Sequence, residues 1–140
     1  MAKQKSWAEK LSGAKPHEVK PAPCDMAGMK AGEIMLIPSP LLIDAYVRAI
    51  PPGTTVDVRA MRRQLAADNG AEVTCPITTG IHLRVVAEAA HEAMMAGAAP
   101  HDVAPFWRVI DPGTPLAKKL SFDAAVIAER RARETGSPRA

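Results

Sequence analysis

Aromatic residues are scarce in this chain of 140 residues, in which two Trp, two Phe and one Tyr make up 4% of the sequence. Cysteine is equally rare, and Cys24 and Cys75 lie far apart and outside any CxxC spacing. This pattern excludes a disulfide framework and a cysteine-based zinc site, and it favours a reducing compartment.

No apolar run approaches the ~20 residues of a membrane helix. The start MAKQKSWAEK also lacks the apolar stretch of a signal peptide. We therefore expect a cytoplasmic protein, associated with the nucleoid if it is bacterial, that makes no membrane contact.

A strong charge of either sign is also missing, since the formal net charge is +3 and the isoelectric point is about 9.1. Such a balance permits an anionic partner without requiring one. Hydrophobic residues make up 47% of the chain, which is enough for one domain with a moderate core. Residues 1–32 mix Lys, Pro, Gly and Ala without a sustained period, so we expect a basic, largely extended arm with one helical turn around Trp7. Residues 33–136 are expected to form the domain and residues 137–140 a tail.

Apolar spacing and breaker residues predict the elements of this domain. Residues 33–37 are an apolar run followed by two prolines, which is typical of a strand. Helices are predicted over residues 40–49, 58–68, 79–95 and about 121–133, with Asp57 capping the second and Thr78 or Thr79 capping the third. Residues 105–110 are predicted as a strand and residues 111–115 as a turn. This order indicates a single domain that is mainly α with short strands, similar to a winged helix-turn-helix.

Three arginines, Arg59, Arg62 and Arg63, share the polar face of the second predicted helix. One interpretation is a solvated charged face. The other is contact with phosphate, where each cation adds salt-sensitive affinity by releasing counterions. In the second interpretation the third helix lies in a DNA groove, and its first turns supply further contacts. The candidates there are Thr78, Thr79, Gly80, His82 and Arg84.

Several stretches between residues 36 and 136 resemble one known family. IPPGTTV at 50–56, the following RAMRRQLA, PFWRVI at 105–110 and ETG at 134–136 are similar to the C-terminal domain of the O6-alkylguanine-DNA alkyltransferases. Those enzymes carry Pro-Cys-His-Arg-Val, whose cysteine accepts the alkyl group from a flipped base and whose histidine helps to activate it. Here Phe106 stands at the cysteine position and Trp107 at the histidine position. Neither side chain supplies a nucleophile or a base. The resemblance therefore implies the non-enzymatic alkyltransferase-like branch of the family, with double-stranded DNA as partner and no cofactor.

The stretch APFWRVIDPG at 104–113 has two interpretations. In the first, Phe106, Trp107 and Arg108 form a pocket in which aromatic rings stack on an extruded base and the arginine reaches phosphate. In the second, one aromatic ring packs in the core and Arg108 braces the strand against an acid such as Asp111. Strand alternation would send Phe106 and Arg108 to one face and Trp107 to the other, so the two rings would not easily share a pocket.

Cys75 is the one other candidate for chemistry. It directly precedes the third predicted helix, where backbone amides lower the pKa of a thiol. A displaced alkyl acceptor is therefore one alternative, and a small apolar filler is the other. His82 and His91 lie roughly two and a half turns apart, on different sides of the same helix, so no metal site is expected.

We thus expect a monomeric, non-catalytic DNA-binding protein that recognises alkylated or otherwise altered bases by base flipping, in DNA repair, with a repair protein as a further partner. Two alternatives stay open. One is an alkyltransferase that uses Cys75, which the absent cysteine and histidine of the family motif disfavour. The other is a protein-interaction module that has lost DNA binding, which the arginine face and the basic ends of the chain disfavour.

Overall fold

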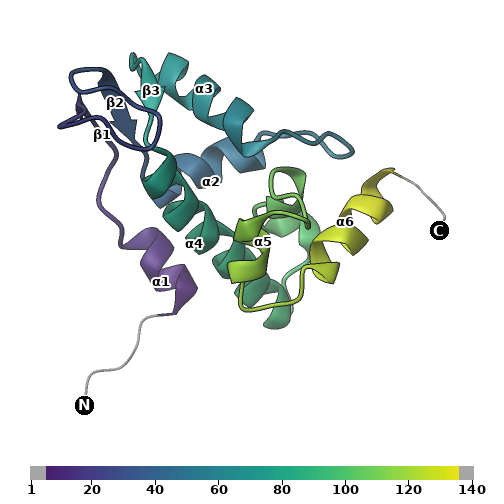
Figure 1. The fold of residues 1–140 in the computed structure, drawn as a ribbon. Coiled ribbons are helices and arrows are strands. Elements are labelled where there is room, and N and C mark those ends of the chain that lie inside the picture. The colour runs from purple at the N-terminus through teal and green to yellow at the C-terminus, as the bar shows by residue number, and fades with distance from the viewer. Residues whose placement is uncertain (1–5, 136–140) are drawn as a thin grey trace.

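The protein is described here by a computed structural model, which covers residues 6–135, so the expected tail at 137–140 lies outside the described residues. Figure 1 shows three short strands at one end of a group of helices, with α4 running through the middle of the molecule. The described elements, in chain order, are α1 (Trp7–Ser12), β1 (Glu18–Pro21), β2 (Ile34–Ile37), α2 (Pro40–Arg48), α3 (Val58–Asp68), β3 (Val73–Thr74), α4 (Pro76–Met95), η1 (Pro100–Asp102), η2 (Phe106–Arg108), α5 (Pro115–Lys119) and α6 (Ala125–Thr135). The chain is therefore a small mixed α/β structure in which helices outweigh strands.

The starts of α2 and α3 agree with the prediction, and local capping explains both. Ser39 Oγ accepts a hydrogen bond from the Leu42 amide at 3.0 Å, just before Pro40 in the first turn of α2. The Asp57 carboxylate accepts one from the Ala60 amide at 2.7 Å. Side chains of this kind satisfy amides of the first turn that have no partner within the helix. These two starts therefore follow from short stretches of sequence.

The sheet joins the N-terminal segment to the rest of the protein. β2 is the central strand, with β1 antiparallel to it and β3 parallel to it. All three strands precede α4 in the chain, and no described residue after α4 belongs to a strand. Among the residues that the structure describes, no helix combines the length and the apolar character needed to cross a membrane.

The helical turn expected around Trp7 is present as α1, but the residues that follow it pack into the domain and do not form a separate extended arm. α1 starts with a capping box, in which Ser6 and Glu9 each accept a backbone amide of the other. β1 follows, and behind it Ala22 and Met29 are buried against Met35. The sequence shows no sustained period here because these residues are ordered by contacts with β2 and α4, which lie elsewhere in the chain.

Three predicted boundaries in the second half of the chain also differ. α4 begins at Pro76, earlier than predicted, with Cys75 in place of a threonine at the N-cap. Residues 115–119 form the short helix α5, capped by Thr114, where only a turn was expected, and α6 begins at Ala125. The predicted strand at 105–110 is instead the 3₁₀-helix η2, in which the Val109 amide donates to the Phe106 carbonyl at 3.1 Å. An apolar run buried on all sides carries no periodicity that separates strand from helix, which explains this error.

The core surrounds α4. Leu83 and Val86 of α4 are fully buried, together with Ile43 of α2, Met61 of α3 and Ile127 of α6. The helix also contacts α1, α5 and η2. α3 reaches the start of α4 through residues 69–75, which include β3. This connection places Arg62 of α3 beside Thr74, two residues before the start of α4.

Candidate nucleic-acid interface

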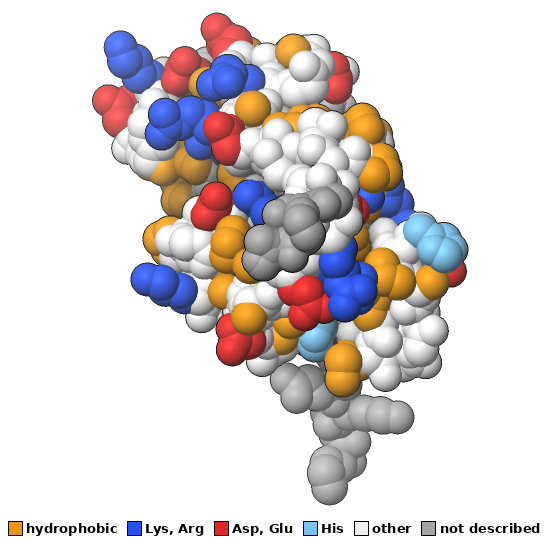
Figure 2. Space-filling model, turned by 90° about the vertical axis from the view of Figure 1, so that its right-hand side faces the viewer, with side chains coloured by type: hydrophobic (Ala, Val, Ile, Leu, Met, Phe, Trp, Pro, Cys, Tyr) orange, Lys and Arg blue, Asp and Glu red, His pale blue; other side chains and the backbone are white. Residues whose placement is uncertain are grey.

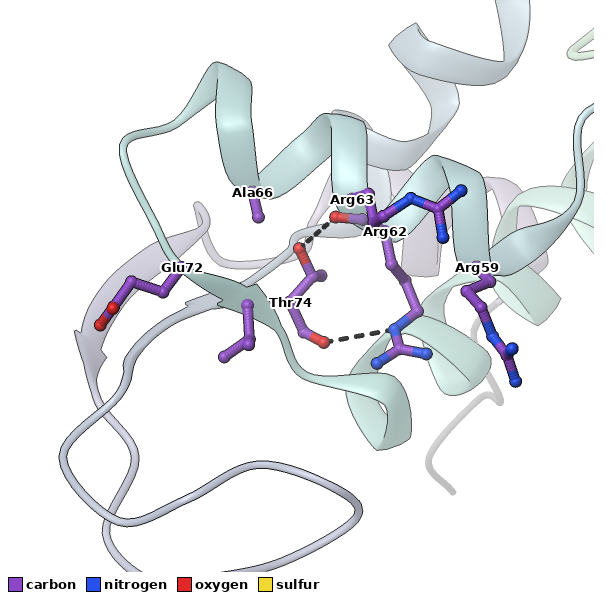
Figure 3. Close-up of a pocket in the computed structure, with 7 residues that line it drawn as sticks. Arg59, Arg62, Arg63, Ala66, Glu72 and Thr74 are labelled. Atoms are coloured by element: carbon purple, nitrogen blue, oxygen red, sulfur yellow. Dashed lines mark hydrogen bonds between the residues drawn. The ribbon is translucent and has the colours of Figure 1, made fainter.

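Arg59, Arg62 and Arg63 of α3 line an open cavity of about 280 Å³ beside β3. Figure 3 shows Arg59 and Arg62 extending on the same side of α3, toward the segment that leads from β3 into α4, while Arg63 extends in another direction. On the face seen in Figure 2, by contrast, Lys and Arg side chains lie among Asp and Glu side chains. The arginine cavity is thus a local concentration of positive charge on a molecule whose overall charge is mild.

Arg62 is held in place by β3. Its Nε donates to the Thr74 carbonyl at 3.3 Å, and the Thr74 hydroxyl donates back to the Arg62 carbonyl at 2.7 Å (Figure 3). Burial, and after it the positive charge of Arg59, lower the pKa of Arg62 below its ordinary value. The same repulsion that lowers this pKa would be relieved by an anion placed between the two guanidinium groups.

Arg59 and Arg63 are exposed, and neither has an ion-pair partner within the described residues. Among the described residues that line the cavity, Glu72 is the one acidic residue. Its Oε1 accepts a hydrogen bond from the Ile34 amide at 2.8 Å. Figure 3 shows its carboxylate on the far side of the cavity from the guanidinium groups. The cavity therefore brings three cations together with one distant carboxylate, an arrangement suited to binding anionic oxygens.

The candidates in the first turns of α4 do not form one surface. Thr79 is fully buried, and its hydroxyl donates to the Cys75 carbonyl at 2.6 Å, so it has no surface with which to touch DNA. His82 is half-buried, with Nδ1 2.7 Å from the Pro38 carbonyl oxygen. Gly80 lies on another side of the helix, in a cavity beside α1. Thr78 is half-buried in the first turn of α4, next to the segment that connects α3 to α4. Its hydroxyl donates to Cys75 Sγ at 3.3 Å.

Arg84 is engaged inside the protein. Its guanidinium lies over the ring of Trp7, 5.4 Å from the centroid, and its Nε is 3.7 Å from a carboxylate oxygen of the buried Glu88. Glu88 stands four residues after Arg84, the spacing at which helical side chains pair, whereas Trp7 is distant in sequence. The structure therefore separates Arg84 from the α3 arginines and gives it a role in packing α1 on α4.

Phe106 and Trp107 belong to the core. They are 0% and 1% exposed, and their rings meet edge to face with centroids 5.1 Å apart. Phe106 also packs against Phe122, at 5.4 Å. Because η2 replaces the predicted strand, both rings turn inward instead of alternating. The two rings therefore do not line a base pocket together, although Trp107 and Arg108 lie at the wall of an open cavity of about 260 Å³ beside Arg130 and Arg133.

Arg108 is a structural brace, as the second interpretation expected, but its partner is Glu134 and not Asp111. Its Nε donates to both carboxylate oxygens of Glu134, at 2.9 and 3.0 Å, and its Nη1 donates to the Ile50 carbonyl at 2.6 Å. Asp111 pairs with Arg131 instead, at 3.5 Å. Arg108 thus ties η2 to α6 and to Ile50, two residues after the end of α2.

The surroundings of Glu134 favour its charged form. Burial alone would raise its pKa, but hydrogen bonds from Arg108 and from the Gly53 amide outweigh that effect, and its pKa lies below the ordinary value of 4.5. Gly53 adopts a φ of +81°, a conformation that favours glycine, at the turn that presents this amide to Glu134. This ion pair therefore holds three segments that are distant in sequence.

Cys75 is 5% exposed and packs with Ala22, Met29 and Met35. These surroundings are those of a small apolar filler, and they leave the sulfur without access to an alkylated base. Over the part of the chain that the structure describes, no three His, Cys, Asp or Glu side chains gather closely enough to hold a metal ion.

Comparison with known proteins adds no relative, since no family model, curated protein or solved structure matches the chain. The sequence did not reveal the second cavity, which is lined in part by Trp7, Lys10, Leu116 and Lys119. The one signal that pointed to it was Trp7, a large aromatic side chain in a segment that otherwise has none.

Proposed function

We propose that this protein binds double-stranded DNA without catalysing a reaction, and that the α3 arginines contact its phosphate groups. The observation that carries the proposal is the cavity of Arg59, Arg62 and Arg63, in which two exposed guanidinium groups have no acidic partner among the described residues. The pKa of the third is lowered by burial and by its neighbour Arg59. Guanidinium groups in this situation gain the most binding free energy from an anion with several oxygens, such as a phosphodiester.

The position of the cavity also fits the proposal. Arg62 is bonded to Thr74, two residues before α4, so phosphate bound at α3 would lie beside the start of the longest helix (Figure 3). In a helix-turn-helix arrangement the first helix crosses the DNA backbone and the second approaches a groove. We propose this arrangement for α3 and α4, with Thr78 as the nearest predicted side chain on α4.

The similarity to alkyltransferase-like proteins favours a role in DNA repair, with altered bases as the preferred target. The preference for altered bases does not rest on stacking by Phe106 and Trp107, because both side chains fill the core. An alkyl transfer to Cys75 is disfavoured by the burial of its side chain. Intact mass after incubation with alkylated DNA tests that alternative directly, since transfer would add the mass of the alkyl group.

The experiment is fluorescence anisotropy with matched duplexes, with and without one O6-methylguanine, across a salt series. Two variants are compared with the natural chain. Arg59→Ala/Arg63→Ala removes two phosphate contacts, and Arg133→Ala is the matched control, because Arg133 is an exposed arginine of α6 paired with Glu129 at 3.1 Å. We expect the slope of log affinity against log salt to fall by about 2 in the double variant. The control should keep the natural slope.

No binding at low salt, or an unchanged slope in the double variant, would contradict the proposal. Tighter binding to the modified duplex would support recognition of altered bases. Equal binding to both duplexes would leave a general DNA-binding protein whose contacts are made to the backbone.

A further inference from the structure

A second cavity, of about 670 Å³, lies where α1 and α5 meet α4. Its volume is in the range of sites that enclose small organic molecules, roughly 300–1,000 Å³. Much of its wall is apolar and comes from Trp7, Ile77, Ile81 and Leu116. Ile77 and Ile81 are 50% and 58% exposed, so the cavity presents aliphatic surface that a ligand would remove from water.

The charged groups at this cavity all have one sign. Lys10, Arg84 and Lys119 line it, and its described lining includes no acidic side chain. Lys10 Nζ lies 4.2 Å from the centroid of the Trp7 ring, which places a cation directly beside apolar surface. The charge of Arg84 is shared with Glu88, whereas Lys119 has no ion-pair partner in the described part of the chain. The cavity thus combines an apolar wall with a positive rim.

The wall formed by α1 is anchored to α4. The amides of Trp7 and Ala8 donate to the carboxylate of Glu92 at 3.2 Å each, and Arg84 lies over the Trp7 ring. Because these contacts fix the N-terminal turn of α1 against α4, the cavity is formed before any ligand arrives. A site that is already formed loses little affinity to ordering its own groups.

We propose that this cavity binds a small organic anion with an apolar body, such as an aryl or acyl carboxylate or sulfonate. The apolar body contacts the isoleucines and Trp7, and the anionic group pairs with Lys10 and Lys119. The composition of the wall favours this class over a nucleotide, because the described lining residues include no side-chain hydrogen-bond acceptor for the edges of a base and Trp7 has their one neutral side-chain donor. It also excludes organic cations, which the three positive groups repel.

This site shares the first turns of α4 with the proposed DNA interface, but it uses none of the α3 arginines. The two cavities share no lining residue, since one is formed by α3 and β3 and the other by α1, α4 and α5. Arg59→Ala/Arg63→Ala should therefore leave ligand binding unchanged, and each proposal can fail without the other.

The test uses the full chain and the fluorescence of 1-anilinonaphthalene-8-sulfonate, with dodecanoate as a competing anion and dodecyltrimethylammonium as its cationic counterpart. We expect saturable binding of the dye, displacement by dodecanoate and none by the cation. Ile81→Glu places a carboxylate in the wall and should weaken binding by more than about tenfold. Lys119→Ala should weaken it by about two- to fivefold, as for an ion pair at a partly exposed rim. Lys118→Ala is the matched control, because the neighbouring Lys118 is exposed and does not line the cavity.

Equal displacement by the cationic amphiphile would overturn the proposal, since the positive rim would then play no part. An unchanged affinity in Ile81→Glu, with circular dichroism showing a folded chain, would place the dye elsewhere and would also overturn it. Displacement by a mononucleotide as effective as that by dodecanoate would replace the proposed class with nucleotides.

Discussion

Arg108 and the α3 arginines are the same residue type in opposite situations. Arg108 uses its guanidinium for the two oxygens of Glu134 and the Ile50 carbonyl, and its side chain is 13% exposed. Arg59 and Arg63 are exposed, and within the described residues no acid pairs with them. A guanidinium whose three nitrogens all donate within the protein holds the fold, whereas one without partners has its hydrogen-bonding capacity available to a ligand. The comparison shows that a motif arginine beside two aromatic residues can be structural while an ordinary helix face carries the candidate site.

The largest effect is expected from the rings beside Arg108. Phe106→Ala would leave a cavity between Trp107 and Phe122 and should lower the free energy of unfolding by about 3–5 kcal/mol. Urea denaturation followed by circular dichroism measures this loss. If the variant instead kept its stability and lost affinity for modified DNA, the aromatic pair would form a base pocket. The conclusion that Arg108 and its neighbours serve only the fold would then be wrong.

Arg108→Ala comes next. It would leave the Glu134 carboxylate and the Ile50 carbonyl without their partner, and we expect a loss of about 3 kcal/mol in the free energy of unfolding. Arg108→Lys should recover only part of it, because an ammonium group cannot reproduce the planar fork of donors. Arg133→Ala, which breaks an exposed pair, should change stability by less than about 0.5 kcal/mol in the same measurement.

The loss of stability in Glu134→Gln should depend on pH. At neutral pH we expect it to cost about 2 kcal/mol, because a charged acceptor for Arg108 is replaced by a neutral one. The pKa of Glu134 is lower in the folded chain than its ordinary value of 4.5, so its stabilising effect is full above that value and is lost as the pH falls toward the lowered pKa. The difference between the two proteins in urea denaturation should therefore shrink below about pH 4.5. A difference that stays constant across this range would contradict the assigned ion pair.

The smallest effects on stability are expected at the α3 arginines. Arg59→Ala and Arg63→Ala should each change the free energy of unfolding by less than about 0.5 kcal/mol, because neither side chain pairs with an acid in the described structure. Arg62→Ala should cost about 1 kcal/mol, since it removes the hydrogen bond to the Thr74 carbonyl. Thermal denaturation at fixed salt compares the three. Equal losses would show that Arg59 and Arg63 are also structural and would remove the distinction from Arg108.

The candidate site was predicted unevenly. The clustering of Arg59, Arg62 and Arg63 follows from their spacing on a helix whose apolar face is plain in the sequence, and the structure places all three at one cavity. The α4 candidates fared differently, because the helix begins at Pro76 and Thr79 is turned into the core. A threonine at the predicted N-cap would lie at the end of the helix, whereas a helix that begins at Pro76 places Thr79 inside its first turns, where its side chain faces the core.

The sequence by itself determined the helices of the central part of the chain and the face of α3 that carries the arginines. Capping by Ser39 and Asp57 and the spacing of apolar residues act over a few positions, so a short stretch contains their cause. Only the tertiary structure decided that residues 106–108 form a 3₁₀ turn, that Glu134 is the partner of Arg108, and that α1 closes a cavity against α4. Each of these depends on groups distant in sequence, and such contacts form only when the packed core brings those groups together.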